Sequence, residues 1–415
     1  MSEKEYIVTL NKGTDYAQFN QEMIASTGSG NIPERTVDVA DARVLSTRNT
    51  HYALTDAEAE ELRKDNRVTD VQLRPEDRDD IEIGHDAVQT ANFNKSSSDS
   101  GDYRDWGKIT HSFKENKYGT GTSLGGSFSR PYSMDGTGVD VVIQDSGLQV
   151  DHPEFFDANG NSRMQLIDWY TESGLSGTQS GNHYRDYDGH GTHCGGTATG
   201  LNFGWASNAK VFSVKVGGLE GSGDSGGISI SQCFDVIKGW HENKPIDPKT
   251  GFKRPTIVNA SWGYSGSIGS SFNNIQSYVY RGANYNSSTA GWSSSTSYHR
   301  DTYGFYPYYR FPSGYRYPVR IASVDADVED CVDAGVHICI AAGNNSFKIS
   351  DSTDPDYDNV IFWTSGNNYY HRGSSPFDTG AIIVGSTDST PENATTERKT
   401  SFSCTGPGVD IFSAG

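Results

Sequence analysis

Hydrophobic and polar positions in the first 76 residues alternate in patterns typical of short strands and helices. Thr55 stands three residues before Glu58, which forms a capping box at the start of a helical pattern, because each side chain can bond the other's backbone N–H. The elements that we expect are strands over 6–10, up to Leu45 and over 68–73, and helices over 14–25 and 57–64. Together they predict a small α+β domain over residues 1–76.

Residues 77–102 lack such a pattern. They begin in a charged stretch and end in a run rich in Ser, Lys and Asp, so we expect a flexible linker. Over residues 103–415, apolar runs with the length of buried parallel strands alternate with helical stretches. The runs cover 139–143, 209–216, 256–260 and 336–341. This rhythm predicts an α/β domain built on a doubly wound parallel sheet.

One segment of the second domain departs from this rhythm. Residues 264–318 are rich in Ser, Gly, Tyr and Asn, and aromatic residues crowd the stretch 303–317. We expect a long surface loop inserted into the α/β domain. A loop of this length either decorates the surface with some packing of its own or carries a surface for substrate or partner, and the sequence leaves both open.

The charge and composition of the chain narrow its partners. A formal net charge of -19 repels phosphate backbones, so we expect neither nucleic acid nor an anionic membrane as a partner. The best apolar run, 336–342, is far shorter than the ~20 residues of a membrane-spanning helix. The first residues lack the features of a secretory signal, which predicts a cytoplasmic product as synthesised. The five cysteines are odd in number and sparse, and we expect free, mostly buried thiols.

Three polar residues stand where buried strands end or helices begin. Asp145 follows the strand over 139–143, His190 lies in a glycine-rich segment just before a helical stretch, and Asn344 follows the strand over 336–341. Active sites of open α/β sheets assemble at the carboxyl ends of the strands. Taken singly, Asp145 and Asn344 also fit ordinary turns, and His190 with His193 fits a metal pair that lacks a third ligand.

Four motifs in order make a more specific pattern. They are Asp145-Ser-Gly, His190-Gly-Thr-His, Ser261-Trp-Gly and Ala341-Ala-Gly-Asn344. In residue type and order they resemble the subtilisin-like serine protease (subtilase) family. The resemblance implies that Asp145 orients His190, that His190 is the general base, and that Asn344 supplies the side-chain half of an oxyanion hole; the triad scheme itself is the general one that subtilisin exemplifies.

The same resemblance implies a substrate and a way of binding it. A protein or peptide would pair in extended form with two short segments that line the cleft. These segments consist of Ser261, Trp262 and Gly263, and of Ala341, Ala342 and Gly343. The expected function is serine endopeptidase activity on proteins.

Other parts of the chain resemble further features of the family. The first domain is similar to the family's inhibitory propeptide, which implies that its tail, residues 73–86, occupies the chain's own cleft. Cys194 resembles the cysteine of the proteinase K branch, where it implies a packing residue. Glu154 stands where many relatives place a calcium ligand, which leaves a structural calcium ion open. We expect no required cofactor.

The family's nucleophile motif, Gly-Thr-Ser-Met-Ala, does not occur in residues 1–415. Gly121-Thr-Ser123 shares its first three residues, but the glycines that follow cannot sustain a helix. We therefore expect the serine beyond Gly415, a subtilisin-like fold that is incomplete at its C-terminus, and little or no hydrolysis by this chain alone. The alternative is a catalytically dead subtilisin scaffold that acts as a structural or peptide-binding protein. The composition, rich in Ser, Gly and Tyr, also resembles that of subtilases of marine phages and environmental bacteria. A virion-associated location is therefore left open.

Overall fold

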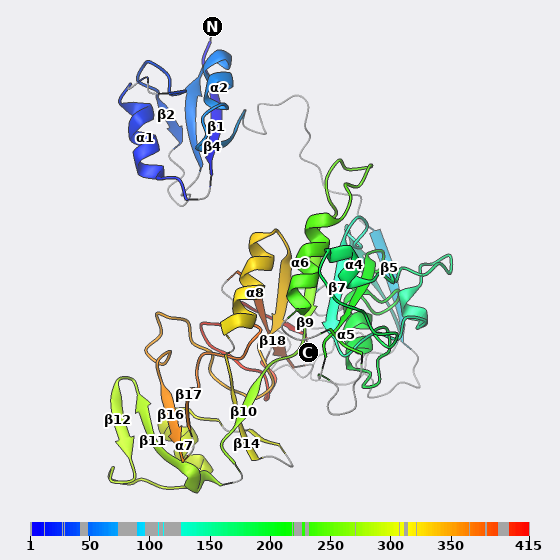
Figure 1. Ribbon diagram of the computed structural model, residues 1–415, viewed down its shortest axis with the longest axis vertical. Helices are drawn as coiled ribbons and strands as arrows, with labels where there is room; N and C mark the ends of the chain where they lie inside the picture. Colours follow the sequence, from blue (N-terminus) through cyan, green and yellow to red (C-terminus); the bar gives the residue numbers. More distant parts are fainter. Residues whose placement is uncertain are drawn as a thin grey trace. The chain divides into compact units, whose positions relative to one another are not determined.

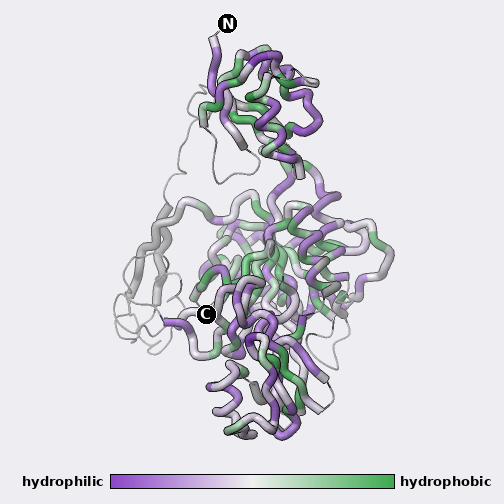
Figure 2. The backbone as a smooth tube through the Cα atoms, turned by 90° about the vertical axis from the view of Figure 1, so that its left-hand side faces the viewer, coloured by the Kyte–Doolittle hydropathy of each residue, from purple (hydrophilic) through white to green (hydrophobic). Residues whose placement is uncertain are grey.

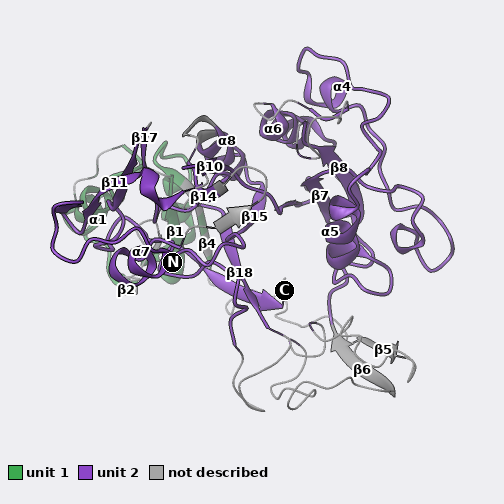
Figure 3. Ribbon diagram, turned by 90° about the horizontal axis from the view of Figure 1, so that it is seen from below, with its two compact units in different colours: residues 1–85 green, residues 86–415 purple. Residues whose placement is uncertain are grey.

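A computed structural model of the chain divides it into two units, residues 1–85 and residues 86–415 (Figure 3). The boundary falls within the predicted linker, 77–102. The structure describes residues 2–11, 13–26, 28, 30–41, 49–73, 89–95, 107, 111, 126–217, 219, 226–228, 232–269, 271–306, 308–310, 314–320, 322–364, 366–377, 380–388 and 398–414.

The first unit is a four-stranded antiparallel sheet with two helices. Its elements are β1 (Lys4–Leu10), α1 (Tyr16–Ile24), β2 (Val39–Asp41), β3 (Asn49–Leu54), α2 (Asp56–Leu62) and β4 (Val68–Leu73). The strand order is β2-β3-β1-β4, which is the split βαβ arrangement. The sequence pattern missed β3, and the strand expected up to Leu45 lies in 42–48, outside the described residues.

The core of the first unit follows from the alternation in β1. Tyr6, Val8 and Leu10 point to one face and are buried, together with Phe19 and Met23 of α1. The capping box predicted for α2 is confirmed: Thr55 Oγ1 accepts from the backbone N–H of Glu58, and the Glu58 carboxylate accepts from the backbone N–H of Thr55. The sequence alone therefore defined the start of this helix.

The second unit contains a central sheet, a two-stranded ribbon and an elaborate insertion (Figure 1). Its elements are β5 (Gln89–Lys95), β6 (Gly126–Tyr132), β7 (Asp140–Asp145), η2 (Pro153–Phe155), α4 (Trp169–Ser173), α5 (His190–Thr199), β8 (Lys210–Lys215), α6 (Cys233–Asn243), β9 (Thr256–Ala260), β10 (Ser265–Ser267), η3 (Phe272–Asn274), β11 (Ile275–Tyr280), β12 (Ala283–Asn286), α7 (Thr296–Tyr303), β13 (Tyr308–Arg310), β14 (Gly314–Pro318), α8 (Ala322–Asp333), β15 (His337–Ala341), β16 (Val360–Trp363), β17 (Gly366–Tyr369), β18 (Ile382–Thr387) and β19 (Ile411–Ala414).

The central sheet is parallel, with the order β19-β18-β15-β9-β7-β8. The chain moves from β7 to its neighbour β8 and then returns to the other side of β7, where β9, β15, β18 and β19 follow outward. Four of these strands, β7, β8, β9 and β15, were predicted from their apolar runs. The sequence pattern missed β18 and β19.

Helices cover both faces of this sheet. Val142 of β7 packs in the same cluster as residues of α6 and α8, such as Trp240 and Val328. Its neighbour Val141 points the other way and packs with residues that include Ala198 of α5. In Figure 2 the hydrophobic stretches of the tube lie in the interior of this unit. The α/β class with a doubly wound sheet is therefore confirmed.

The predicted linker contains a strand. Residues 89–95 form β5, which pairs in antiparallel register with β6, from Gln89 opposite Tyr132 to Lys95 opposite Gly126. This part of the linker is therefore ordered by pairing with a segment some 30 residues away, which no local pattern indicates. The rest of the linker, the segment with Ser123 and all of the expected tail over 73–86 except Leu73, the last residue of β4, lie outside the described residues.

The expectation of a loop over 264–318 is wrong, because the insertion has secondary structure and a core. Strands β11 and β12 form a hairpin whose two turn residues, Arg281 and Gly282, both have positive φ, as a type I′ turn requires. Strand β11 also pairs with β16, and the resulting sheet has the order β12-β11-β16-β17. Stacked aromatic rings, with Tyr278 and Tyr303 4.4 Å apart, fill the space beneath. Tyr278, Tyr303 and Tyr317, which the sequence pattern placed in a loop, are therefore core residues.

Among the described residues, no helix combines the length and the apolar character that crossing a bilayer requires.

Candidate active site

The candidate residues lie at one edge of the central sheet. Gln144 of β7 and Ile340 of β15 both pair with Ala260 of β9, so the three strands end at the same level. Neighbouring strands are about 4.8 Å apart, which places the ends of β7 and β15 roughly 10 Å from each other. The connections after β7 and β9 lead to opposite faces of the sheet, and ligands of such folds bind where this reversal occurs.

Asp145 and His190 form a hydrogen-bonded pair. Nδ1 of His190 lies 2.8 Å from Oδ1 of Asp145, and that oxygen also accepts the backbone N–H of Ser146 at 2.7 Å. The Asp145 side chain is fully buried, whereas 51% of the His190 side chain is exposed. A carboxylate on Nδ1 favours the tautomer that leaves Nε2 as a proton acceptor on the exposed side. The pair thus has the arrangement of a base and the group that orients it.

The hydrogen bond to Asp145 also stabilises the positively charged form of the His190 imidazole. The hydrogen bond to Asp145 raises the pKa of His190, with a second contribution from Cys194, while partial burial opposes the increase. A buried carboxylate next to the ring therefore favours the imidazolium that forms when Nε2 takes a proton. The Asp145 carboxylate thus stabilises the protonated form of His190.

A second acidic residue, Asp186, holds this pair in place. Its carboxylate accepts hydrogen bonds from the Ser146 hydroxyl at 2.9 Å, from the Gly189 N–H at 2.8 Å and from the Thr192 N–H at 2.8 Å. Burial pushes the pKa of Asp186 up, but these hydrogen bonds together lower it. Asp186 therefore connects the end of β7 to the first turn of α5, which carries His190.

The sequence motifs did not indicate a role for Asp186. Its place four residues before His190, in a turn rich in Asp and Gly, was the available signal. That signal could not show that the two carboxylate oxygens accept hydrogen bonds from residues on both sides of His190, Oδ1 from the Gly189 N–H and Oδ2 from the Thr192 N–H.

A glycine lets α5 approach the end of β7. A Cβ on Gly191 would lie 2.1 Å from the carbonyl oxygen of Gly147 and 3.1 Å from Cβ of Asp145. No described atom lies within 4 Å of the corresponding position on Gly196, one and a half turns further along the same helix. The two glycines thus differ in packing although both are helical.

We expect the substitution Gly191→Ala to lower the free energy of unfolding by about 1–3 kcal/mol, because backbone atoms must move apart. Gly196→Ala is the matched control and should stabilise the chain by up to about 1 kcal/mol through helix propensity. Denaturant unfolding of both variants of the 1–415 chain checks this. Equal stabilities for the two variants would show that the contact at Gly191 is not tight.

A sequence profile of the subtilase family matches residues 136–415, which is more than half of the chain. The chain belongs to the subtilase family.

Relatives of this subtilase include two proteases. The cuticle-degrading serine protease of Orbilia oligospora is 31% identical over 140 residues, which cover 32% of this chain and 31% of the relative. Proteinase R of Parengyodontium album is 32% identical over 159 residues, covering 37% of this chain and 35% of the relative. The alignments thus span about a third of the length of these relatives.

Among solved structures, a cold-adapted subtilisin-like serine proteinase is similar at 19% identity, with a TM-score of 0.39 and coverage of 75% of this chain and 72% of that chain. The α/β fold of this chain is defined by its own strand order, β19-β18-β15-β9-β7-β8.

The two wall segments of the subtilase lie at the ends of β9 and β15. The side chain of Trp262 is buried, and its Nε1–H donates to Oε1 of Gln144 at 3.2 Å, so the indole belongs to the core. Ala342 uses its N–H to bond the carbonyl of Val384, and the carbonyl of Gly343 accepts from Cys404. These two groups of the second segment are engaged within the fold. Pairing of substrate with Ser261–Gly263 and Ala341–Gly343 stays a prediction.

Asn344 follows β15 after Gly343, which has a φ of +101°. Its side chain is exposed at the edge where β7 ends with Asp145. The structure thus places this amide two strands away from the Asp145–His190 pair, and the oxyanion role stays a prediction.

Glu154, the candidate calcium ligand, has other partners. Its two carboxylate oxygens accept the N–H groups of Asn202 and Phe203 and the side-chain amide of Asn202 at 2.7–3.1 Å. Calcium needs six to eight oxygen ligands with lone pairs directed at the ion. The residues around Glu154 therefore do not fit a calcium site, and the carboxylate acts as a cap for the turn after α5.

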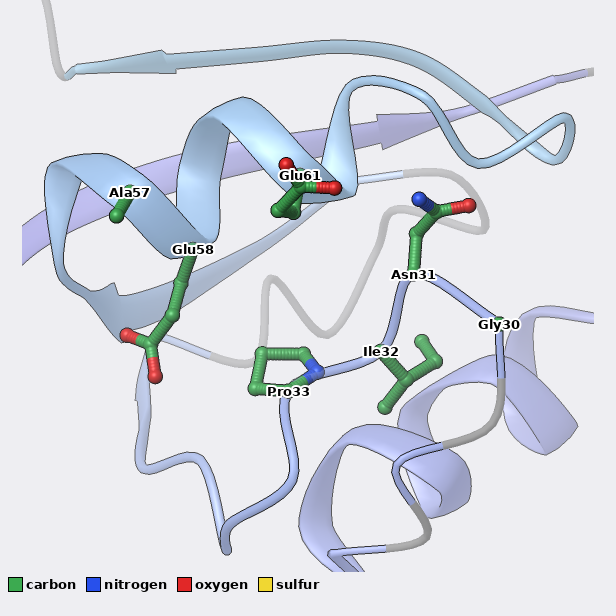
Figure 4. Close-up of a pocket in the computed structure, with 7 residues that line it drawn as sticks. All are labelled: Gly30, Asn31, Ile32, Pro33, Ala57, Glu58 and Glu61. Atoms are coloured by element: carbon green, nitrogen blue, oxygen red, sulfur yellow. The ribbon is translucent and has the colours of Figure 1, made fainter.

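A surface pocket lies in the first unit, away from these residues in the chain (Figure 4). Ile32 and Pro33 form its apolar side, and α2 contributes Glu58 and Glu61. The Glu58 carboxylate is already paired with Arg35 at 2.7 Å. We assign no chemistry to this pocket.

Proposed function

We propose that this subtilase is a serine endopeptidase that hydrolyses peptide bonds in proteins. The observation that supports it is the buried Asp145 carboxylate 2.8 Å from Nδ1 of a half-exposed His190. In this proposal His190 takes the proton of the nucleophile and returns it to the leaving amine, while Asp145 keeps the ring oriented and balances its charge. Asn344 would donate its amide to the developing oxyanion.

The proposal places the nucleophilic serine outside residues 1–415, because the motif Gly-Thr-Ser-Met-Ala is not among them. Residues 1–415 then supply the base, the orienting carboxylate and the amide donor. The chain by itself should hydrolyse peptides at near-background rates, since no acyl-enzyme can form without the nucleophile.

The first unit, in the same proposal, is an inhibitory propeptide. Its support is a separate core, formed by residues that include Val8, Phe19 and Tyr52, in a unit joined to the second through the segment 74–88. A unit of this kind can be removed by a cut in the connection without disturbing the other core. The rate of peptide hydrolysis by the complete gene product should then rise as residues 1–76 are cleaved from the rest.

The test is labelling of the complete product of the gene that encodes residues 1–415 with a fluorophosphonate, which reacts with activated serines. We expect one labelled serine, and His190→Ala should slow its labelling by at least about 10³-fold. His193→Ala is the matched control, because His193 is an exposed histidine of the same helix. Peptide binding without labelling or hydrolysis would instead support a catalytically dead scaffold.

A further inference from the structure

Three potential metal donors meet beside the Asp145–His190 pair. Sγ of Cys194 lies 3.8 Å from Nδ1 of His190, and one donor atom each of Asp145, His190 and Cys194 lie within 4.8 Å of one another. His190 and Cys194 are four residues apart in α5, so both side chains project from one face of the helix. Two elements, α5 and the end of β7, thus present sulfur, nitrogen and oxygen to one point.

A second, independent feature points to a ligand at this place. Oδ2 of Asp145 is buried and, among the described residues, has no hydrogen-bond partner. Buried carboxylate oxygens without a partner are rare, because removing such a charge from water is costly. The other oxygen, Oδ1, has two partners, His190 and Ser146. A cation next to the carboxylate would satisfy the remaining lone pairs.

The donor set selects the kind of ion. Thiolate, imidazole and carboxylate together suit Zn²⁺, whereas Ca²⁺ and Mg²⁺ take oxygen ligands. Donors bound to zinc at its usual distances are roughly 3.4–3.6 Å apart in a tetrahedron. The present separation of Nδ1 and Sγ, 3.8 Å, exceeds this range by about 0.2 Å, and that of Nδ1 and Oδ1, 2.8 Å, falls short of it by about 0.6 Å, so the carboxylate and the imidazole must move apart to admit the ion. One thiolate and one carboxylate also neutralise the two charges of the ion, which reduces the cost of placing it in a partly buried site.

We propose that Asp145, His190 and Cys194 form a zinc site that inhibits the enzyme. Zinc binds the lone pair of Nδ1, the single proton of the neutral ring moves to Nε2, and the thiol of Cys194 releases its proton to solvent. Nε2 then carries a proton and cannot accept another from a nucleophile. The inhibitory consequence rests on the proposed peptidase function, whereas binding of the ion rests on the geometry alone.

Binding is tested on the reduced, metal-free 1–415 chain by calorimetry with ZnCl₂ and by absorption spectroscopy with CoCl₂. We expect one Zn²⁺ per chain and a thiolate-to-cobalt charge-transfer band. Cys194→Ala should remove the band and weaken zinc binding by at least about 100-fold, since even residues outside the ligand shell contribute 10- to 100-fold. His193→Ala and Cys339→Ser are matched controls that should leave both signals unchanged, because neither residue belongs to the donor set.

Absence of the cobalt band, unchanged zinc binding by Cys194→Ala, or loss of binding by His193→Ala would overturn the site. A measurement on the unsubstituted chain avoids dependence on the folding of a variant. Zinc should protect Cys194, but not Cys339, from alkylation by iodoacetamide, as read residue by residue by mass spectrometry. Equal protection of the two thiols, or none, would count against the proposal.

Inhibition is tested on the complete gene product. ZnCl₂ should suppress peptide hydrolysis, a chelator should restore it, and Cys194→Ala should make it resistant. An active product that binds no zinc refutes the site but not the peptidase. A product that binds zinc through Cys194 and hydrolyses nothing refutes the proposed function but not the site.

Discussion

The substitution Asp145→Asn is expected to lower kcat for peptide hydrolysis by about 10⁴-fold and to leave KM nearly unchanged. The carboxylate is fully buried and accepts a hydrogen bond from Nδ1 of His190. A carboxamide in its place can present an N–H to the ring, which favours the tautomer with its proton on Nε2. The substituted enzyme also lacks the negative charge that stabilises the imidazolium in the transition state.

Steady-state kinetics of the complete gene product, in the presence of a chelator to exclude metal effects, measures this loss. Asp151→Asn is the matched control, because Asp151 is an exposed acid in the loop that follows β7. It should retain activity within about twofold, as expected for a surface position. A loss below about tenfold for Asp145→Asn would show that the carboxylate does not act through His190.

Acidification from about pH 7 to about pH 4 should destabilise the insertion by about 3 kcal/mol through His299 alone. The imidazole is fully buried and stacks on Phe272, with ring centroids 5.1 Å apart. Nδ1 lies 3.0 Å from the Tyr278 hydroxyl, and within the described part of the chain Nε2 has no hydrogen-bond partner. A charged ring would need acceptors at both nitrogens, which this site does not supply.

The sign of this effect follows from the two protonation equilibria. Burial lowers the pKa of His299 from 6.5 to about 4 in the folded protein, so the unfolded chain binds the proton first as the pH falls. The stabilisation is complete above about pH 6.5 and is lost between that value and about pH 4. Burial lowers the pKa of His371 as well, which adds to the loss in the same direction. The pKa of Asp356 is lowered from 3.8 by its hydrogen bond to Arg281, so its contribution is lost only below this window.

Hydrogen exchange of residues 275–303 in the 1–415 chain, followed as a function of pH, measures the local stability of the insertion. His299→Gln keeps an acceptor for Tyr278 and should remove most of the dependence between about pH 6.5 and about pH 4. His193→Gln, at an exposed position, is the control and should leave the dependence intact. Protection that does not change with pH in the unsubstituted chain would contradict the prediction.

The insertion also shows where local sequence patterns are insufficient. Strand β11 pairs on one side with β12, three residues further along, but on the other side with β16, about 80 residues away. The β strand tendency of Tyr- and Ser-containing segments depends on such partners, because cross-strand contacts supply most of the stabilisation. The same reason explains why β5, in the predicted linker, was missed: its partner is β6.

The sequence by itself determined the α/β class, the positions of β7, β8, β9 and β15, and the residues that stand at their carboxyl ends. This was sufficient because a buried parallel strand is a continuous apolar run, and all strands of a parallel sheet end at the same edge. Asp145 and Asn344 could therefore be assigned to one edge before any contact was known. The capping box at Thr55 is equally local, and it too was readable from the sequence.

Only the tertiary structure decided how these residues meet. The 2.8 Å contact between Asp145 and His190, the connection of both their segments to Asp186, and the approach of Cys194 to Nδ1 all depend on how closely α5 packs on the end of β7. The separation between α5 and the end of β7 is set by the contact of Gly191 with the carbonyl of Gly147. These two residues are 44 positions apart in the chain. Side-chain convergence of this kind arises from packing between elements, which periodicity along a single element does not encode.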